Sequence, residues 1–270
     1  MEAIRLLAST ILLRPYVFIF LAAYLFLAIP AWGWRRTFLY SLLGYGLAWG
    51  AEYSSSHGGF PFFGPYSYFM EPTHDKELWI AGVPFMDSLS FVFLTFAGLQ
   101  MARLVRAPLT RGRLGRWDVR WAAPEGSIGW KTWVLAGLFT MGLDVVIDPL
   151  ALRGDRWFLG QIYEYTHDGI YFGVPLSNFA GWALLAWVIL GAFCLLERFL
   201  LSRYLGAWRG YVADALIGGA LFSGILIFNL LMTFVIGEIL LGLLGCAWSA
   251  CMLAPVMRRM YAKIPAVSPG

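Results

Sequence analysis

The sequence predicts an all-α integral membrane protein, a bundle of about seven transmembrane helices with six as the alternative. Hydrophobic residues fill 60% of the 270 positions and charged residues only 13%, which leaves too little polar surface for a water-soluble domain. Several apolar runs are long enough to cross a hydrocarbon core of roughly 30 Å. Lys and Arg lie in the short segments between these runs, which is typical of membrane loops and excludes a nucleic-acid-binding face. We therefore expect residues 1–270 to form a single transmembrane domain.

The predicted crossings follow one another along the chain, at about residues 16–31, 37–53, 83–102, 130–147 and 179–196. The stretch 213–256 is too long for one crossing, so we expect it to turn at Gly237-Glu238 and to give two helices. Arg14-Pro15 interrupts the first apolar stretch, and residues 3–13 are expected to form a short helix in the membrane interface. Pro149 should end the fourth crossing at Asp148, because the residue before a proline disfavours helical geometry.

The basic residues predict the orientation of the bundle. With seven crossings, 15 of the 20 Lys and Arg fall on one side, and the other five are Arg5, Arg14, Lys76, Arg153 and Arg156. The positive-inside rule then favours a multi-pass protein of the inner (cytoplasmic) membrane, with its N-terminus outside and its C-terminus in the cytoplasm. The two longest outer loops join the second and third crossings and the fourth and fifth crossings.

A weak internal repeat relates two helix–outer loop–helix units, 37–102 and 130–197. The motifs Thr-His-Asp at 73–75 and Gly-Val-Pro at 82–84 recur at 166–168 and 173–175, and Glu52 then aligns with Asp144. Both units run in the same direction, which predicts a pseudo-twofold axis along the membrane normal and a site where the units meet.

Four carboxyl groups near the outer ends of three crossings are the predicted catalytic residues: Glu52, Asp87, Asp144 and Asp148. A charged side chain at the centre of a membrane helix costs roughly 2.5–3.5 kcal/mol on insertion scales. Acids confined together in an apolar site cannot all ionise, so at least one should remain protonated and able to act as a general acid. We expect Asp144 to be that acid and Asp87 or Glu52 to orient a water molecule.

Other residues of the outer loops are expected to support this group or to bind the substrate. The supporting residues are His57, Asn178, His167 and Tyr53, and the substrate-binding aromatics are Phe60, Phe62, Tyr66, Trp79, Phe85 and Tyr171. Tyr68, Tyr163 and Tyr165 are further aromatic faces that could stabilise a cation. Because no HExxH, CxxC or GxSxG motif is present, we expect no metal, no redox cofactor and no serine nucleophile.

The motifs resemble those of the CruF-type carotenoid biosynthesis proteins, which include carotenoid 1,2-hydratases and bisanhydrobacterioruberin hydratases. The resemblance covers roughly residues 40–255 and is carried by the segments 52–62, 64–66, 82–88, 144–149 and 173–182. It implies a cofactor-independent lyase that adds water across the terminal 1,2 double bond of an acyclic, lycopene-like carotenoid in the bilayer. Protonation at C2 would give a tertiary cation at C1, which water would capture. Other membrane enzymes of the carotenoid pathway would be its partners.

Two other functions fit the same acids. Asp144-x-x-x-Asp148 is similar to the second acidic motif of metal-dependent membrane prenyltransferases, although the longer first motif is missing. A non-catalytic carotenoid or lipid carrier, or a proton-coupled transporter, would also place carboxyls inside a bundle. A retinal photoreceptor is excluded, because Lys76 and Lys263 lie outside the predicted crossings and Lys131 lies at the very start of one, so none is buried within the membrane.

Overall fold

The computed structural model describes residues 1–58, 66–106, 109–114, 117–122, 128–167, 169–206 and 214–261, and it confirms the all-helical membrane fold. Six helices among these residues are long and apolar enough to cross a membrane. They are α2 (Pro15–Trp32), α4 (Phe85–Arg106), α5 (Trp130–Ala151), α6 (Leu176–Leu196), α8 (Asp214–Val235) and α9 (Ile239–Tyr261). A π-helical turn (Glu197–Leu201) and the short α7 (Ser202–Leu205) extend α6.

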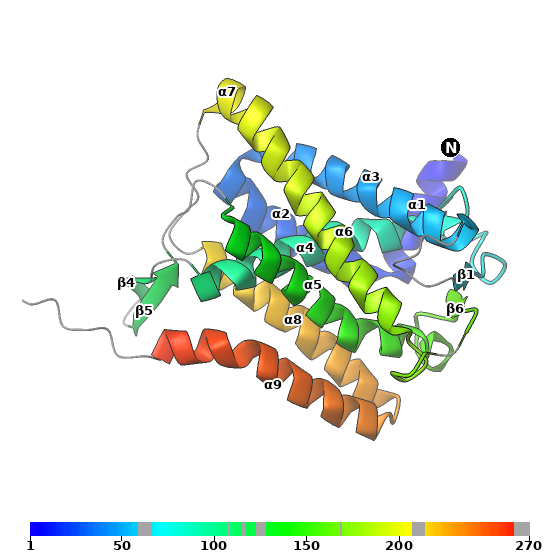
Figure 1. The fold of residues 1–270 in the computed structure, drawn as a ribbon. Coiled ribbons are helices and arrows are strands. Elements are labelled where there is room, and N and C mark those ends of the chain that lie inside the picture. Colours follow the sequence, from blue (N-terminus) through cyan, green and yellow to red (C-terminus); the bar gives the residue numbers. More distant parts are fainter. Residues whose placement is uncertain are drawn as a thin grey trace, which may run out of the picture.

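The predicted crossing at 37–53 lies within α3 (Trp34–Gly58), which is long enough to span a membrane but is not among those six helices. Its arginines, glycines and the polar run that ends in His57 lower its apolar character. α3 nevertheless lies alongside the bundle and packs against α2, α4 and α6 (Figure 1). The described residues therefore contain six helices that are long and apolar enough to cross a membrane, and α3 would be the seventh.

The two breaks predicted within apolar stretches, at Arg14-Pro15 and at Gly237-Glu238, are confirmed. The helix α1 (Glu2–Leu13) ends at Arg14, and Pro15 begins α2. Gly237 has a φ of 81° in the turn between α8 and α9. The predicted stop at Asp148 is wrong, because α5 continues through Pro149 to Ala151. Proline removes only its own N–H, and the last turn is retained since the Leu152 N–H donates to the Asp148 carbonyl at 3.0 Å.

Three short antiparallel ribbons, which the helical periodicity did not predict, join the helices at their ends. β1 (Tyr66–Tyr68) pairs with β6 (Tyr163–Tyr165), β2 (Trp79–Ile80) with β3 (Val83–Pro84), and β4 (Leu109–Leu114) with β5 (Trp117–Ala122). A 3₁₀ turn (Gly154–Arg156) precedes β6. β1 and β6 lie at one end of the bundle, and β4, β5 and α7 lie at the other (Figure 1). The loops that join α3 to α4 and α5 to α6 are therefore structured.

Two tight turns in these loops share an uncommon backbone conformation. Ala81 and Gly82 have φ values of 50° and 80°, and Phe172 and Gly173 have φ values of 52° and 92°. Each pair connects two antiparallel residues, Ile80 to Val83 and Tyr171 to Val174. Two consecutive residues with positive φ are typical of two-residue hairpin turns, which favour glycine at these positions.

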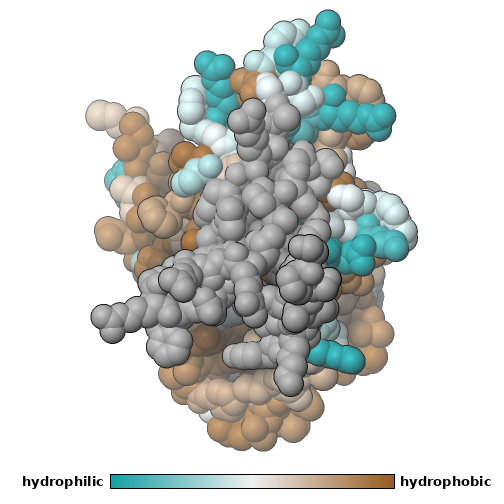
Figure 2. All heavy atoms as spheres, turned by 90° about the vertical axis from the view of Figure 1, so that its left-hand side faces the viewer, coloured by the Kyte–Doolittle hydropathy of each residue, from teal (hydrophilic) through white to brown (hydrophobic). Residues whose placement is uncertain are grey.

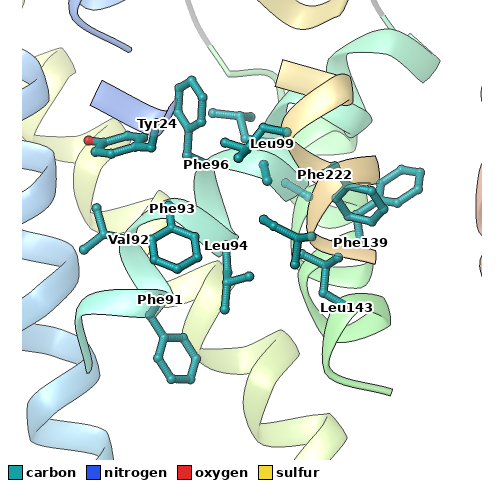
Figure 3. Close-up of a cluster of buried hydrophobic side chains, with 14 of the residues drawn as sticks. Tyr24, Phe91, Val92, Phe93, Leu94, Phe96, Leu99, Phe139, Leu143 and Phe222 are labelled. Atoms are coloured by element: carbon teal, nitrogen blue, oxygen red, sulfur yellow. The ribbon is translucent and has the colours of Figure 1, made fainter. Parts of the chain in front are cut away.

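The core of the bundle is built around α4, whose residues from Phe91 to Leu104 are buried without interruption. Phe93, Phe96 and Leu99 meet side chains of α2, α5 and α8 in the close-up of Figure 3. α4 and α5 approach closely at Gly98, where an added Cβ would lie 2.3 Å from the Thr140 hydroxyl.

The outward faces of the helices are also apolar. Seen from the end that carries α7, hydrophobic side chains cover much of the flanks (Figure 2). Phe26, Leu138, Ile227 and Leu243 are among the large apolar residues that are exposed. An apolar outer surface around an apolar core is the pattern expected of a protein whose solvent is lipid.

Candidate active site

A cavity lies among the ends of the helices that face β1 and β6, and its space, including the part that opens to solvent, is about 980 Å³. α2, α3, α4, α5, α6 and α8 all contribute to its wall, together with β1 and the segment that contains β6. Most of the lining is apolar, and the exceptions are concentrated in two groups of carboxyl and phenol side chains. The cavity therefore has a mostly apolar wall and one polar end, where the carboxyl and phenol groups lie.

The four carboxyl groups singled out in the sequence all line this cavity. Glu52 lies near the end of α3, and Asp87 lies in the first turn of α4, directly after the β2–β3 hairpin. Asp144 and Asp148 lie on successive turns of α5, with 0% and 7% of their surface exposed. Residues from three helices that are distant in the chain thus meet in one space.

Four tyrosines on the β1–β6 ribbon face these carboxyl groups. Tyr66 pairs with Tyr165 and Tyr68 pairs with Tyr163, while Ser67 and Glu164 between them are exposed. Because successive side chains of a strand point to opposite faces, both Tyr-x-Tyr segments present their rings to the same side. We call Tyr66, Tyr68, Tyr163 and Tyr165 the ribbon tyrosines.

The β1 tyrosines bind the first pair of carboxyls. The Tyr66 hydroxyl donates to Glu52 Oε2 at 2.9 Å. The Tyr68 hydroxyl is within hydrogen-bond distance of two carboxyl oxygens, Glu52 Oε2 and Asp87 Oδ2, the second at 2.9 Å. A single phenol thus connects α3 to α4.

The β6 tyrosines both bind Asp148, one of the two carboxyls on α5. The Tyr163 hydroxyl donates to Asp148 Oδ1, and the Tyr165 hydroxyl donates to Asp148 Oδ2 at 2.7 Å. Asn178 on α6 directs its amide nitrogen to Asp144 Oδ2 at 2.8 Å and to Asp148 Oδ2 at 3.2 Å. Asp148 is therefore surrounded by donors.

Asp144 has far fewer partners than Asp148. Its Oδ1 is buried and has no hydrogen-bond partner among the residues that the structure describes. A buried carboxylate oxygen without a donor is costly, and its protonation removes most of that cost. The geometry thus makes Asp144 the carboxyl best suited to carry a proton.

The ribbon tyrosines remain protonated at neutral pH. Burial raises the pKa of each of them well above the usual value of 10.0, and the neighbouring carboxylates raise it further. Glu52 has this effect on the pKa of Tyr66 and Tyr68, and Asp148 has it on the pKa of the two β6 tyrosines. All four phenols are therefore available as hydrogen-bond donors.

An aromatic wall adjoins the polar end of the cavity. Phe91 of α4 and Trp182 of α6 stack with their ring centroids 4.2 Å apart and their planes 29° apart. Tyr16 and Phe20 of α2 line another part of the cavity, and Phe228 of α8 stacks on Tyr16 at 5.1 Å. Such a surface suits a flat apolar ligand, and its ring faces attract a positive charge.

A buried ion pair holds the α3–α4 and α5–α6 loops against the start of α2. Arg14 Nη2 lies 3.1 Å from Glu77 Oε2, and the two side chains are 1% and 0% exposed. Arg14 also donates to the carbonyl of Phe158 at 3.1 Å and to that of Leu159. This arginine therefore fixes the two loops that carry β1 and β6.

The other predicted site residues divide between the cavity and its surroundings. Tyr66 and Asn178 line the cavity. Tyr53, His57 and His167 are exposed and do not line it, and the rings of Tyr53 and His57 stack on each other at 4.2 Å.

Three of the predicted aromatics pack elsewhere. Trp79 packs against Tyr68, Phe85 against Tyr45, and Tyr171 against Phe179, and none of the three lines the cavity. Phe60 and Phe62 lie outside the described residues.

The sequence pointed to Tyr68, Tyr163 and Tyr165 only as aromatic faces, whereas their hydroxyls bind the carboxyls. The signal was the Tyr-x-Tyr alternation at 66–68 and 163–165, which has the period of a strand. Trp182 lay in a segment that carries the family resemblance but had no predicted role, and Asn229 carried no signal.

The described residues hold no group of three or more His, Cys, Asp or Glu side chains that is arranged to bind a metal ion. Both oxygens of Asp148 accept hydrogen bonds from phenols, and Asp144 Oδ2 accepts one from an amide.

Comparison with known proteins gives one match. The family model described as "Carotenoid biosynthesis protein" matches residues 11–248, a segment that contains every cavity residue. A search of curated proteins and a search of solved structures each found no match.

Proposed function

This chain belongs to the carotenoid biosynthesis protein family, and from that premise we propose that it is a carotenoid hydratase of the CruF type. Helices that are long and apolar enough to span a membrane surround the cavity, which supports access by a carotenoid dissolved in the bilayer. The proposed reaction adds water across the terminal 1,2 double bond of an acyclic end group and gives a tertiary 1-hydroxy carotenoid.

Asp144 is the proposed general acid. Its proton would be transferred to C2 of the end group, and the positive charge would develop at the more substituted C1. The observation that carries this proposal is the buried, unpartnered Asp144 Oδ1 in the wall of a cavity with three further carboxyls. An alkene is a very weak base, so its protonation requires an acid that is shielded from water and poorly stabilised as an anion.

The rest of the cavity would stabilise the cation. Asp148, which accepts hydrogen bonds from Tyr163, Tyr165 and Asn178, is well stabilised as an anion near the developing charge. The stacked rings of Phe91 and Trp182 offer an adjacent aromatic surface. Glu52 or Asp87, on the other side of the polar end, would orient the water that attacks C1.

We further propose that units 37–102 and 130–197 are structural repeats. The two turns with paired positive φ values, at 81–82 and 172–173, support this relationship, as do the two Tyr-x-Tyr strands that pair with each other. The orientation with the N-terminus outside the cytoplasmic membrane also remains a proposal, supported by the distribution of basic residues.

The test is incubation of the purified protein with lycopene-like substrates in H₂¹⁸O, followed by mass spectrometry of the extracted carotenoids. We expect a product heavier by one labelled water, with the label in a tertiary hydroxyl. Unchanged carotenoid that remains bound to the protein would instead indicate a carrier. Metal-dependent transfer of a prenyl group from an added prenyl diphosphate would indicate a prenyltransferase, and either result would refute the hydratase.

A further inference from the structure

The shared phenol of Tyr68 restricts where protons can lie in the cavity. Its oxygen is within hydrogen-bond distance of Glu52 Oε2 and Asp87 Oδ2. A phenol carries one proton and can donate only one hydrogen bond, although its oxygen can also accept. One of the two contacts therefore requires a proton from the carboxyl, so Glu52 or Asp87 is protonated.

The neighbours of the two acids indicate which one holds that proton. Glu52 Oε2 also accepts a hydrogen bond from Tyr66, so two phenols converge on this one oxygen. Among the described residues, the carboxyl of Asp87 has no hydrogen-bond partner other than Tyr68. Converging donors favour an ionised carboxylate, whereas a buried carboxyl with a single partner favours the neutral acid.

We propose that Asp87 donates its own proton to Tyr68 and that Glu52 is the ionised carboxyl, which accepts the proton of the attacking water. This assignment rests on the proposed hydration and deepens it. It decides which of the two carboxyls, Glu52 or Asp87, accepts the proton of the attacking water. Both phenol contacts of Glu52 involve Oε2, which leaves Oε1 without a hydrogen bond from the described residues. Tyr68 is then a positioning residue that fixes the charge of both acids.

With Asp144 as the proton donor and Glu52 as the proton acceptor, all protons of the reaction are accounted for. The π bond of the alkene breaks, a C–H bond forms at C2 with the proton of Asp144, and a C–O bond forms at C1 with water. One O–H bond of that water breaks, its electron pair remains on the oxygen, and the proton binds to Glu52. Return of one proton from Glu52 to Asp144 through water restores the starting state, so the net change is addition of one water molecule.

The ionisation of Glu52 depends on all the groups that face it. They are Tyr66 and Tyr68 on β1, Asp87 on α4, and Asp144 and Asp148 on α5, with the Arg14–Glu77 pair beyond Asp87. The acids oppose its negative charge, and the two phenols stabilise it. Loss of one phenol should therefore move the acidic limb of the rate–pH profile to higher pH, because Glu52 must be ionised to accept a proton.

Infrared spectroscopy tests the proton positions without any turnover. A protonated carboxyl has a carbonyl stretch that is distinct from the bands of a carboxylate, and we expect two such groups in the cavity, Asp87 and Asp144. Asp87→Asn should abolish one band, Glu52→Gln should leave it, and Tyr68→Phe should shift it because its hydrogen bond is lost. A band that survives Asp87→Asn but disappears in Glu52→Gln would overturn the assignment.

Activity measurements test the role of Tyr68 in the reaction. Tyr68→Phe should lower kcat about 10- to 100-fold, the loss expected for one hydrogen bond to a charged group, and should shift the acidic limb. Tyr45→Phe is the matched control, since Tyr45 lies on the same helix as Glu52 and its buried hydroxyl has no partner among the described residues. Wild-type kcat and pH profile in Tyr68→Phe would overturn the positioning role.

The two experiments separate this inference from the proposed function. Labelled alcohol from the wild type, together with an unchanged band in Asp87→Asn, would retain the hydratase and refute the proton assignment. No labelled alcohol, together with the predicted bands, would refute the hydratase and remove the water-side role of Glu52.

Discussion

Replacement of Asp144 by Asn removes the proposed acidic proton and changes little else in the cavity. The two side chains have nearly the same shape, and an amide oxygen can still accept the hydrogen bond that Asn178 donates at 2.8 Å. The second carboxyl oxygen, Asp144 Oδ1, has no partner among the described residues, so the change disrupts no hydrogen bond at that atom. We therefore expect Asp144→Asn to fold and to bind carotenoid.

The expected loss of activity follows from the role of the group. A general acid typically contributes about 10²- to 10⁴-fold to a rate, and an amide cannot supply the proton, so kcat should fall by about that factor. The assay is the initial rate of ¹⁸O incorporation by protein in lipid nanodiscs, with bound carotenoid measured separately. The control is Asp155→Asn, which removes an exposed carboxyl in the 3₁₀ turn after α5 and should retain wild-type kcat. Undiminished turnover in Asp144→Asn would refute the assignment of the acid.

Three further predictions concern stability in detergent. Gly98→Ala should lower the free energy of unfolding by about 1–3 kcal/mol, because its Cβ would overlap α5, whereas Gly46→Ala should be tolerated since no atom lies within 4 Å of its Cβ. Glu77→Gln leaves Arg14 buried without a counter-charge and should cost about 3–5 kcal/mol, measured by thermal or denaturant unfolding, and an unchanged midpoint would contradict the structural role of this pair. Folding raises the pKa of the ribbon tyrosines above 10.0, so their contribution is intact below pH 10 and is lost as the pH rises further. The melting temperature should fall more steeply above that pH than in a variant with Phe at all four positions.

The bundle could be predicted from the sequence because lipid imposes a simple requirement. A chain in a hydrocarbon core must satisfy its backbone hydrogen bonds internally, so long apolar runs become helices whatever their neighbours are. The break at Arg14-Pro15 and the turn at Gly237 were equally local signals, and both are confirmed. The end of α5 was misplaced because Pro149 removes only the hydrogen bond of its own N–H, and Leu152 still donates to Asp148 in the last turn.

The site was only partly predictable because its chemistry depends on contacts between distant segments. Rare acids in apolar surroundings identified Glu52, Asp87, Asp144 and Asp148, since a membrane protein retains such residues only at a cost. The partners of these acids depend on the pairing of β1 with β6, which no local pattern specifies. Tyr53 and His57 lie shortly after Glu52 in the sequence, yet the helical rotation of α3 directs them away from the cavity.

The pairing of β1 with β6 also affects how the protein matures. β1 emerges from the ribosome before α4 and α5, whereas β6 follows them, so the phenol-lined cover over the acids is incomplete until the second outer loop has been synthesised. A nascent chain that ends within α5 has Glu52 and Asp87 but lacks the donors that surround Asp148. Membrane insertion of the early helices and completion of the cavity are thus separate events, and the second depends on the pairing of two strands that are synthesised at different times.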